Sequence, residues 1–153
     1  MLIQQNGYGC GLYAVANACN LKNFVTPERL EQSKSGNNVG QLSRWLQDDG
    51  LQIYIDYLYY HASGRKLPPS VTGYKPFGDL SYIPILLQVQ QTPNSKNHII
   101  GGKLGKDGIL YLYDSLKDDE IETTLAKVNK MYHCVYGLNV FVSYENHKYA
   151  VIE

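Results

Sequence analysis

The chain has no excess of charge of either sign and no long hydrophobic run. Its 153 residues contain 14 Lys and Arg and 14 Asp and Glu, so the formal net charge is zero. Nucleic acids and anionic membranes attract proteins mainly through clustered positive charge, so we expect neither as a partner. No apolar stretch reaches the roughly 20 residues that cross a membrane as a helix. The length predicts one domain, residues 1–153.

The chain is also poor in cysteine. Three cysteines do not make a disulfide framework, and their odd number fits a reducing compartment. No basic and apolar leader follows Met1, so we expect the protein in a cytoplasm, its own or that of a host cell. His133 and Cys134 are neighbours that would point to opposite faces of a strand, and no further ligands stand at metal-binding spacing. We therefore expect no metal and no cofactor.

One cysteine has unusual neighbours. Cys10 lies among three glycines and is followed by an alanine-rich apolar run at residues 12–18. This pattern predicts a buried helix from about Cys10 to Asn20. At a helix N-terminus, the dipole and the free backbone N–H groups stabilise a thiolate and bind an oxyanion. Cys10 is therefore the candidate nucleophile, whereas Cys19, half a turn away, is predicted to be a buried small hydrophobic residue.

A nucleophilic thiolate needs a base and a group that orients the base. His98 opens an apolar stretch, and a Lys-Asp-Gly turn signal at 106–108 separates it from a return strand that ends at Asp114. In an antiparallel hairpin with this turn, His98 and Asp114 emerge at the same end. We predict that His98 is the base and Asp114 its orienting carboxylate. Asn97 or Asn94 would replace Asp114 if the hairpin register differed.

These residues together resemble a known family. The order Gln4-x5-Cys10, then His98, then Asp114 is similar to that of the papain-like cysteine peptidase superfamily. In that superfamily a glutamine about six residues before the cysteine supplies a donor to the oxyanion hole. Gln4 has this spacing, and Gln5 is the reserve candidate. The resemblance implies a cysteine peptidase that cleaves peptide or isopeptide bonds through a Cys-His-Asp triad and a thioester intermediate, without a cofactor.

Two finer resemblances differ in chain order. The local motifs Gln-x-Asn-Gly-Tyr-x-Cys-Gly and Tyr-Asp-Ser-Leu are similar to those of the SUMO and ubiquitin-like-protein proteases and of adenovirus-type protease. Those enzymes run His, Asp, Gln, Cys along the chain. The order Gln, Cys, His, Asp is that of papain and of the leader-peptidase domains of bacteriocin transporters. The chain thus resembles either a circular permutant of the first type or a compact enzyme in papain order. Gly9 and Ile99 stand where the SUMO-protease type usually has Asp and Trp.

The resemblance leaves the substrate open. It implies a protein or peptide substrate, with ubiquitin or a ubiquitin-like modifier as one candidate. A viral or effector protease with deubiquitinase activity is one interpretation, and a leader- or precursor-processing peptidase is the alternative within the same chemistry. Outside that chemistry, the alternatives are a transglutaminase-like acyltransferase or a non-catalytic binding module on the same fold. The intact Cys, His and Asp set favours catalysis over a degenerate module.

The first half of the chain otherwise predicts helices. Thr26 followed by Pro27 is a helix start, with Thr26 as the N-cap. A second helix is predicted from about Val39 to Asp49, with one apolar face that combines Leu42, Trp45 and Leu46. We expect Trp45 to anchor the core, with a place in the wall of a substrate cleft as the alternative.

The second half predicts strands. The clearest is Tyr82–Gln90, which is apolar enough to be covered on both faces. Further strands are expected at 51–60, 135–142 and 149–152, the first with an alternating inward face that ends at Tyr57. A helix is expected at 121–131 with three inward positions, Leu125, Val128 and Met131, and a long loop at 61–79 begins with His61 as a surface histidine.

Helices followed by an antiparallel sheet predict an α+β fold. The resemblance makes it a papain-like fold, in which the N-terminal helix carrying Cys10 packs against the sheet carrying His98 and Asp114.

Overall fold

A computed structural model of the protein describes residues 8–60, 81–117 and 120–145. Within these ranges three helices come first: α1 (Cys10–Cys19), α2 (Pro27–Gln32) and α3 (Val39–Asp48). Six strands and a fourth helix follow: β1 (Ile53–Tyr60), β2 (Tyr82–Gln90), β3 (Asn97–Gly105), β4 (Ile109–Tyr113), β5 (Glu120–Thr124), α4 (Leu125–Met131) and β6 (Cys134–Ser143). This succession confirms the predicted α+β class.

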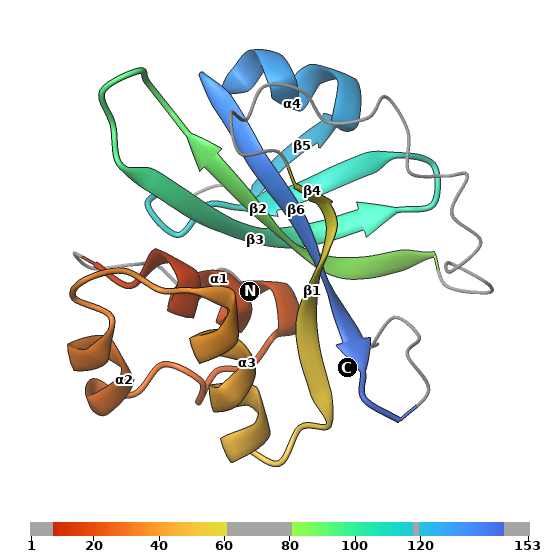
Figure 1. Cartoon of the computed structure of the whole chain (residues 1–153). Helices are drawn as coiled ribbons and strands as arrows, with labels where there is room; N and C mark the ends of the chain where they lie inside the picture. The colour runs from red at the N-terminus through yellow and green to blue at the C-terminus, as the bar shows by residue number, and fades with distance from the viewer. Residues whose placement is uncertain (1–7, 61–80, 118–119, 146–153) are drawn as a thin grey trace.

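The strands form one open antiparallel sheet in the order β1-β6-β2-β3-β4-β5. Helices α1 to α3 lie on one side of the sheet and α4 lies on the other (Figure 1). In β2, Leu86 belongs to the core shared with α1 and α3, whereas Ile85 and Leu87 belong to the core shared with α4. Because successive side chains of a strand point to opposite faces, a strand that is apolar throughout suits a sheet covered on both sides. The prediction for Tyr82–Gln90 is confirmed.

Helix α1 lies very close to the sheet. A methyl group on Gly101, in β3, would overlap the carbonyl group of Ala14, so only glycine permits this approach. Every residue of α1 except Cys10 is buried. Cys19 is 1 % exposed, as predicted. The start of α1 is therefore held against β3, the strand that carries His98.

Local sequence signals start the other two N-terminal helices. Thr26 accepts a hydrogen bond from the Arg29 N–H at 3.2 Å and Pro27 occupies the first helical position, as predicted. Asn38 accepts a hydrogen bond from the Gln41 N–H at 2.8 Å and caps α3. Each cap satisfies a backbone donor that the helix itself leaves without a partner.

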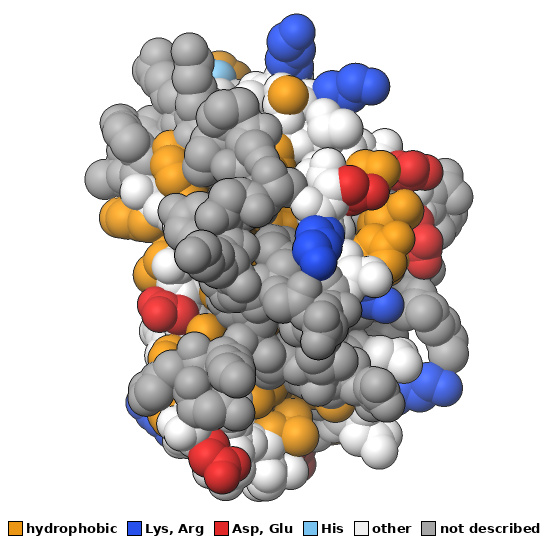
Figure 2. All heavy atoms as spheres, turned by 90° about the vertical axis from the view of Figure 1, so that its right-hand side faces the viewer, with side chains coloured by type: hydrophobic (Ala, Val, Ile, Leu, Met, Phe, Trp, Pro, Cys, Tyr) orange, Lys and Arg blue, Asp and Glu red, His pale blue; other side chains and the backbone are white. Residues whose placement is uncertain are grey.

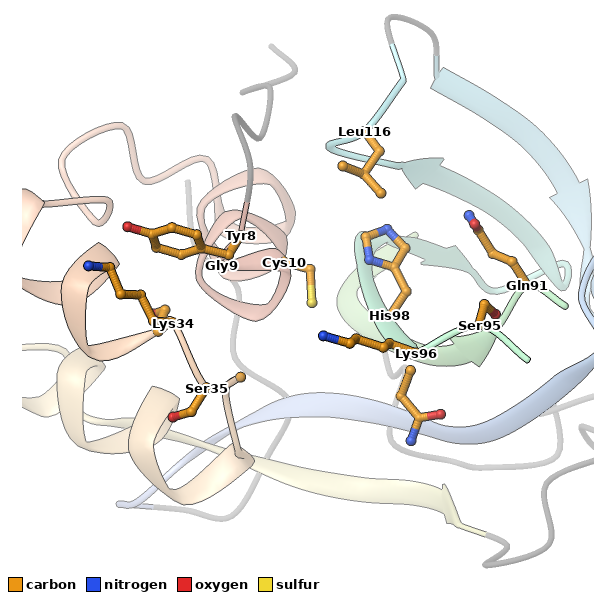
Figure 3. Close-up of a pocket in the computed structure, with 13 residues that line it drawn as sticks. Tyr8, Gly9, Cys10, Lys34, Ser35, Gln91, Ser95, Lys96, His98 and Leu116 are labelled. Carbon is orange, nitrogen blue, oxygen red and sulfur yellow. The ribbon is translucent and has the colours of Figure 1, made fainter. Parts of the chain in front are cut away.

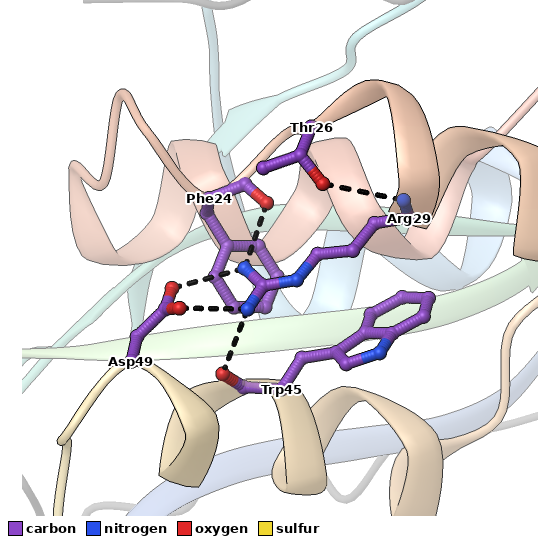
Figure 4. Close-up of polar contacts among 5 residues, drawn as sticks. All are labelled: Phe24, Thr26, Arg29, Trp45 and Asp49. Carbon is purple, nitrogen blue, oxygen red and sulfur yellow. Dashed lines mark hydrogen bonds and ion pairs between the residues drawn. The ribbon is translucent and has the colours of Figure 1, made fainter.

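Arg29 ties α2 to α3 (Figure 4). Its guanidinium donates two hydrogen bonds to Asp49, at 2.6 and 2.9 Å, and one each to the backbone carbonyls of Phe24 and Trp45. It also lies over both aromatic rings, 4.8 and 5.7 Å from their centroids. We call Arg29, Phe24, Trp45 and Asp49 the Arg29 cluster. Trp45 is 6 % exposed in this cluster and in the core, so the core interpretation of Trp45 holds.

Residues 121–131 do not form one helix, and this prediction was wrong in its first part. Glu120–Thr124 is a strand paired with β4, and only Leu125–Met131 is helical. The β-branched side chains at 123 and 124 favour the extended backbone. Thr124 then caps α4 by accepting a hydrogen bond from the Lys127 N–H at 3.2 Å.

Two positions predicted to point inward lie on the surface. Met131 is the last residue of α4 and is 40 % exposed, whereas Leu125 and Val128 are buried as predicted. Tyr57 is 45 % exposed. Tyr57 is still in register with Ile55 against β6, and the register shifts only after it, between Tyr57 and Tyr59.

The described part of the surface carries charges of both signs. Figure 2 shows acidic and basic side chains interspersed on one face, in keeping with the balanced composition. Within the described ranges, none of the helices combines the length and the apolar character that a membrane crossing requires. The strand predicted at 149–152 and the loop predicted at 61–79 with His61 lie outside the described residues.

Candidate active site

Cys10 is the first residue of α1, as predicted. The residue before it, Gly9, has φ +94°, a left-handed conformation that is strained for residues with a Cβ. The Gly9 carbonyl accepts the first hydrogen bond of the helix, from the Tyr13 N–H at 3.0 Å. Gly9 offers no side chain as a cap, so other groups pair with the N–H donors of the first turn. The Cys10 sulfur, which is partly buried, accepts hydrogen bonds from the N–H groups of Ile99 and Gly11.

The register of the sheet brings His98 and Asp114 together. Gly101 of β3 lies opposite Tyr113 of β4, so extending this register by one pair sets Asp114 opposite Ile100. His98 is two residues from Ile100 on the same face, a diagonal neighbour of Asp114 within reach of a long side chain. His98 Nε2 lies 2.9 Å from Asp114 Oδ1, and the two side chains are 8 % and 0 % exposed.

The imidazole of His98 is hydrogen-bonded to both Cys10 and Asp114. Nε2 faces the carboxylate, which leaves Nδ1 for the thiol. Figure 3 shows the ring beside Cys10, between α1 and the sheet. Asp114 Oδ1 also accepts a hydrogen bond from the Leu116 N–H at 3.1 Å, which fixes the carboxylate. We call Cys10, His98 and Asp114 the Cys10 cluster.

The members of the Cys10 cluster shift one another's pKa values. Burial alone would raise the pKa of the Cys10 thiol, but hydrogen bonds from His98 and from the Ile99 N–H, with the positive charge of His98, lower it. Burial alone would lower the pKa of His98, but its hydrogen bonds to Asp114 and Cys10 raise that pKa to about 9. A lowered thiol pKa beside a raised imidazole pKa favours a thiolate–imidazolium pair.

Asp114 remains charged in spite of its burial. Burial would raise the pKa of this carboxyl group, but hydrogen bonds from His98 and the Leu116 N–H keep it below its ordinary value. The positive charges of His98 and Lys117 act in the same direction, and Lys117 Nζ lies 4.0 Å from Asp114 Oδ2. A charged Asp114 stabilises the protonated form of His98.

Cys10 and His98 line a cleft of about 620 Å³. Pockets for small ligands or short peptide segments have volumes of this order. The N-terminal helices and the sheet face each other across it (Figure 3). The helical wall comprises Tyr8, Gly9 and residues 33–36, and the sheet wall comprises Gln91 and residues 95–97, with Leu116 beside them. A substrate chain lying in this cleft would pass the Cys10 sulfur.

The predicted oxyanion hole is described in part. The N–H of Cys10 lies at the start of a helix, where an oxyanion is stabilised by the dipole. Gln4 and Gln5, the candidates for the second donor, lie outside the described residues, so their role stays a prediction. Asn97 and Asn94, the alternatives to Asp114, are both exposed, and Asp114 is the group that faces His98.

The sequence reasoning missed the side chain that caps α1. Asn37 Oδ1 accepts a hydrogen bond from the Leu12 N–H at 3.1 Å, across 25 residues of sequence. The residues around Asn37 indicated only a loop between α2 and α3. A cap supplied by a distant segment has no local sequence signal, because capping patterns are recognised within three or four residues of a helix start.

A metal site was also considered at His133 and Cys134. His133 is exposed and precedes β6, whereas Cys134 is the buried first residue of β6, so the two do not share a strand, contrary to the prediction. Among the residues that the structure describes, no group of three or more His, Cys, Asp or Glu could hold a metal ion.

Two comparisons with known proteins assign no family to this chain. No protein-family model matches the chain, and a search of curated proteins found no match. We therefore argue function from the Cys10 cluster and its cleft.

Proposed function

We propose that the protein is a cysteine peptidase in which Cys10 is the nucleophile, His98 the general acid and base, and Asp114 the group that orients His98. The position of the imidazole carries this proposal. Nε2 lies 2.9 Å from Asp114 Oδ1, and the other ring nitrogen is left for a thiol of lowered pKa. Covalent catalysis by cysteine needs this combination of a thiolate, a proton carrier and a third group that holds the carrier.

The arrangement of the walls supports a papain-like organisation. The nucleophile begins a helix on one side of the cleft, and the base lies on an antiparallel sheet on the other. The order along the chain is Cys, His, Asp. A cysteine at a helix N-terminus gains thiolate character from the dipole, and this gain adds to the effect of the His98 charge.

The reaction begins with the thiolate–imidazolium pair. The Cys10 sulfur attacks the carbonyl carbon of an amide, and a C–S bond forms as the carbonyl oxygen becomes an oxyanion. The His98 imidazolium gives its proton to the leaving nitrogen as the C–N bond breaks, which releases an amine and leaves a thioester. Water then attacks the thioester, His98 takes the proton of that water, and the acid product leaves Cys10 as a thiolate.

The oxyanion is stabilised by backbone and side-chain donors. The Cys10 N–H is the first donor, and we assign Gln4 as the second from the resemblance. Removing one such donor typically slows catalysis by about 10²- to 10³-fold. Asp114 keeps the His98 ring in the tautomer and orientation that present Nδ1 to the sulfur.

The test is labelling by thiol-directed electrophiles, followed by intact mass. Wild type, Cys10→Ala, His98→Ala and Cys134→Ala are each incubated with a peptide electrophile, or with ubiquitin or SUMO carrying a C-terminal electrophile. Cys134 is 5 % exposed, so Cys134→Ala is the matched control for loss of a thiol outside the cleft. We expect one adduct that is absent in Cys10→Ala, about 10²-fold slower in His98→Ala and unchanged in Cys134→Ala.

The preferred probe identifies the class of substrate. Faster labelling by the ubiquitin or SUMO probe indicates an isopeptidase for modifiers, and faster labelling by the peptide probe indicates a processing peptidase. Labelling spread over all three cysteines, or a rate that does not depend on His98, would contradict the proposed catalytic unit.

A further inference from the structure

The start of α1 leaves several backbone N–H groups to be paired from outside the helix. Gly9 is the N-cap residue and has no side chain. The Gly11 N–H is hydrogen-bonded to the Cys10 sulfur. The Leu12 N–H is hydrogen-bonded to Asn37 Oδ1 at 3.1 Å. Among the described residues this leaves the Cys10 N–H as the first-turn donor for an oxyanion.

The Asn37 carboxamide is held at both of its ends. Its Nδ2 donates to Ser33 Oγ at 2.8 Å and to Gln41 Oε1 at 2.9 Å. Ser33 is 1 % exposed and donates in turn to the Arg29 carbonyl at 2.7 Å. An asparagine side chain has one oxygen acceptor and two N–H donors, and all three functions are used here. Asn37 therefore joins α1, α2 and α3 at one point.

Gly11 makes room for this contact. A Cβ on Gly11 would lie 2.7 Å from Asn37 Cβ, closer than real Cβ atoms approach, and 3.0 Å from Asn37 Oδ1. Residues 33–36, which form part of the helical wall of the cleft, lead directly into Asn37, and Asn37 itself does not line the cleft. Its carboxamide contacts the first turn of α1, which carries Cys10, from outside the cleft.

We infer that Asn37 is a positioning residue for the nucleophile, an inference that rests on the proposed function. It accepts a hydrogen bond from the Leu12 N–H and thereby fixes the first turn of α1. In this conformation the Gly11 N–H donates to the Cys10 sulfur and the Cys10 N–H faces the cleft. A neutral amide suits this place because it accepts a hydrogen bond without bringing a negative charge next to the thiolate. A carboxylate at this position would compete with the thiolate for the positive end of the helix.

The test compares Asn37→Asp with Asn38→Asp. Both variants replace one amide by a carboxylate, one residue apart, and Asn38 caps α3 instead of α1. The readout is the rate of Cys10 alkylation by iodoacetamide as a function of pH, measured by intact mass. We expect the inflection for Cys10 to move upward by about one pH unit in Asn37→Asp and to stay in place in Asn38→Asp. Equal shifts in the two variants, or no shift in Asn37→Asp, would overturn the inference.

Two further measurements do not depend on that pair. Asn37→Ala removes the acceptor without adding charge, and we expect a several-fold loss of kcat on a fluorogenic peptide with KM unchanged, because Asn37 does not line the cleft. A loss confined to KM would contradict a positioning role. In the wild type, the Leu12 amide should exchange its hydrogen much more slowly than the Cys10 amide, and equal rates would also contradict it.

Failure of this inference and failure of the proposed function give different results. If Cys10 and His98 are not the proposed catalytic unit, wild-type alkylation has an ordinary cysteine pH profile that does not change in His98→Ala. If Asn37 has no positioning role, the wild-type profile depends on His98 and only the Asn37 variants behave like their controls.

Discussion

The Arg29 cluster lies among the N-terminal helices and the Cys10 cluster lies between α1 and the sheet. Both contain charged groups, but these groups interact differently with their surroundings. Arg29 directs its donors at four acceptors of the protein, two on Asp49 and two on backbone carbonyls. The Cys10 cluster is joined to itself and to backbone N–H groups, yet Cys10 and His98 still line a cleft.

The difference separates charges that join two helices from charges that shift the pKa values of their neighbours. In the Arg29 cluster the interactions connect α2 to α3, and the hydrogen bonds to Asp49 raise the pKa of a guanidinium that is charged in any case. In the Cys10 cluster the pKa of the thiol is lowered and the pKa of the imidazole is raised to about 9. Opposed pKa shifts of a thiol and an imidazole in one cleft are typical of acid–base chemistry, whereas an ion pair that only joins two helices is typical of structure.

The largest effect should come from His98→Gln. Glutamine can still donate a hydrogen bond toward Asp114 but cannot carry a proton from Cys10 to the leaving nitrogen. We expect the rate of peptide hydrolysis to fall by about 10³-fold, with a thermal midpoint close to that of the wild type. The measurement is kcat/KM on a fluorogenic peptide alongside a thermal melt. Retention of most of the activity would mean that His98 does not transfer the proton.

Asp114→Asn should have the next largest effect, a fall of about 10²-fold in kcat. The wild-type rate should decline as pH rises through about 9, where His98 loses the proton that the leaving group needs. The Asp114 charge raises the pKa of His98, so its removal should move this decline to lower pH. The pH dependence of kcat checks both expectations. Asp107→Asn, the same change in the exposed β3–β4 turn, is the control and should leave the profile in place.

Arg29→Met should lower the free energy of unfolding by about 2 kcal/mol, because charge-assisted hydrogen bonds to Asp49 and two carbonyls are lost. The partial exposure of Asp49 limits the cost, since water replaces part of the interaction. Urea unfolding measures the loss, and activity per folded molecule should be unchanged. Arg44→Met makes the same substitution at an exposed position of α3 and should change the free energy by less than about 0.5 kcal/mol. Equal losses in both would remove the special role of the Arg29 cluster.

Asn38→Ala should have the smallest effect, a loss of about 1 kcal/mol in the free energy of unfolding. The substitution removes the cap of α3 at the Gln41 N–H and leaves the Cys10 cluster untouched. Asn38→Ser keeps a capping oxygen and should recover most of the loss in the same urea titration. A change in the pH profile of Cys10 alkylation in Asn38→Ala would show that the cap of α3 is coupled to the Cys10 cluster.

Much of this architecture was predictable because it depends on local patterns. The helix that begins at Cys10, the Thr26–Pro27 helix start and the apolar strand at 82–90 all follow from propensity, capping and periodicity within a few residues. The Cys10, His98 and Asp114 set followed from chemistry, because a thiolate requires a base and the turn at 106–108 brings both ends of its hairpin together.

Other features were not predictable from local patterns. The segment 121–131 looked helical by composition, but pairing with β4 makes its first part a strand. Tyr57 keeps both the alternation of β1 and its register against β6, yet its side chain is 45 % exposed. In the first case tertiary pairing outweighed a weak local preference.

By itself the sequence determined which residues could react, where the first three helices start and which class of fold they belong to. Only the tertiary structure decided how the reactive groups meet. The register of β3 on β4 sets the 2.9 Å contact between His98 and Asp114, and Gly101 lets α1 come close to β3. Asn37 reaches the first turn of α1 across 25 residues. These contacts join segments far apart in the chain, and their geometry arises from packing, which no local propensity encodes.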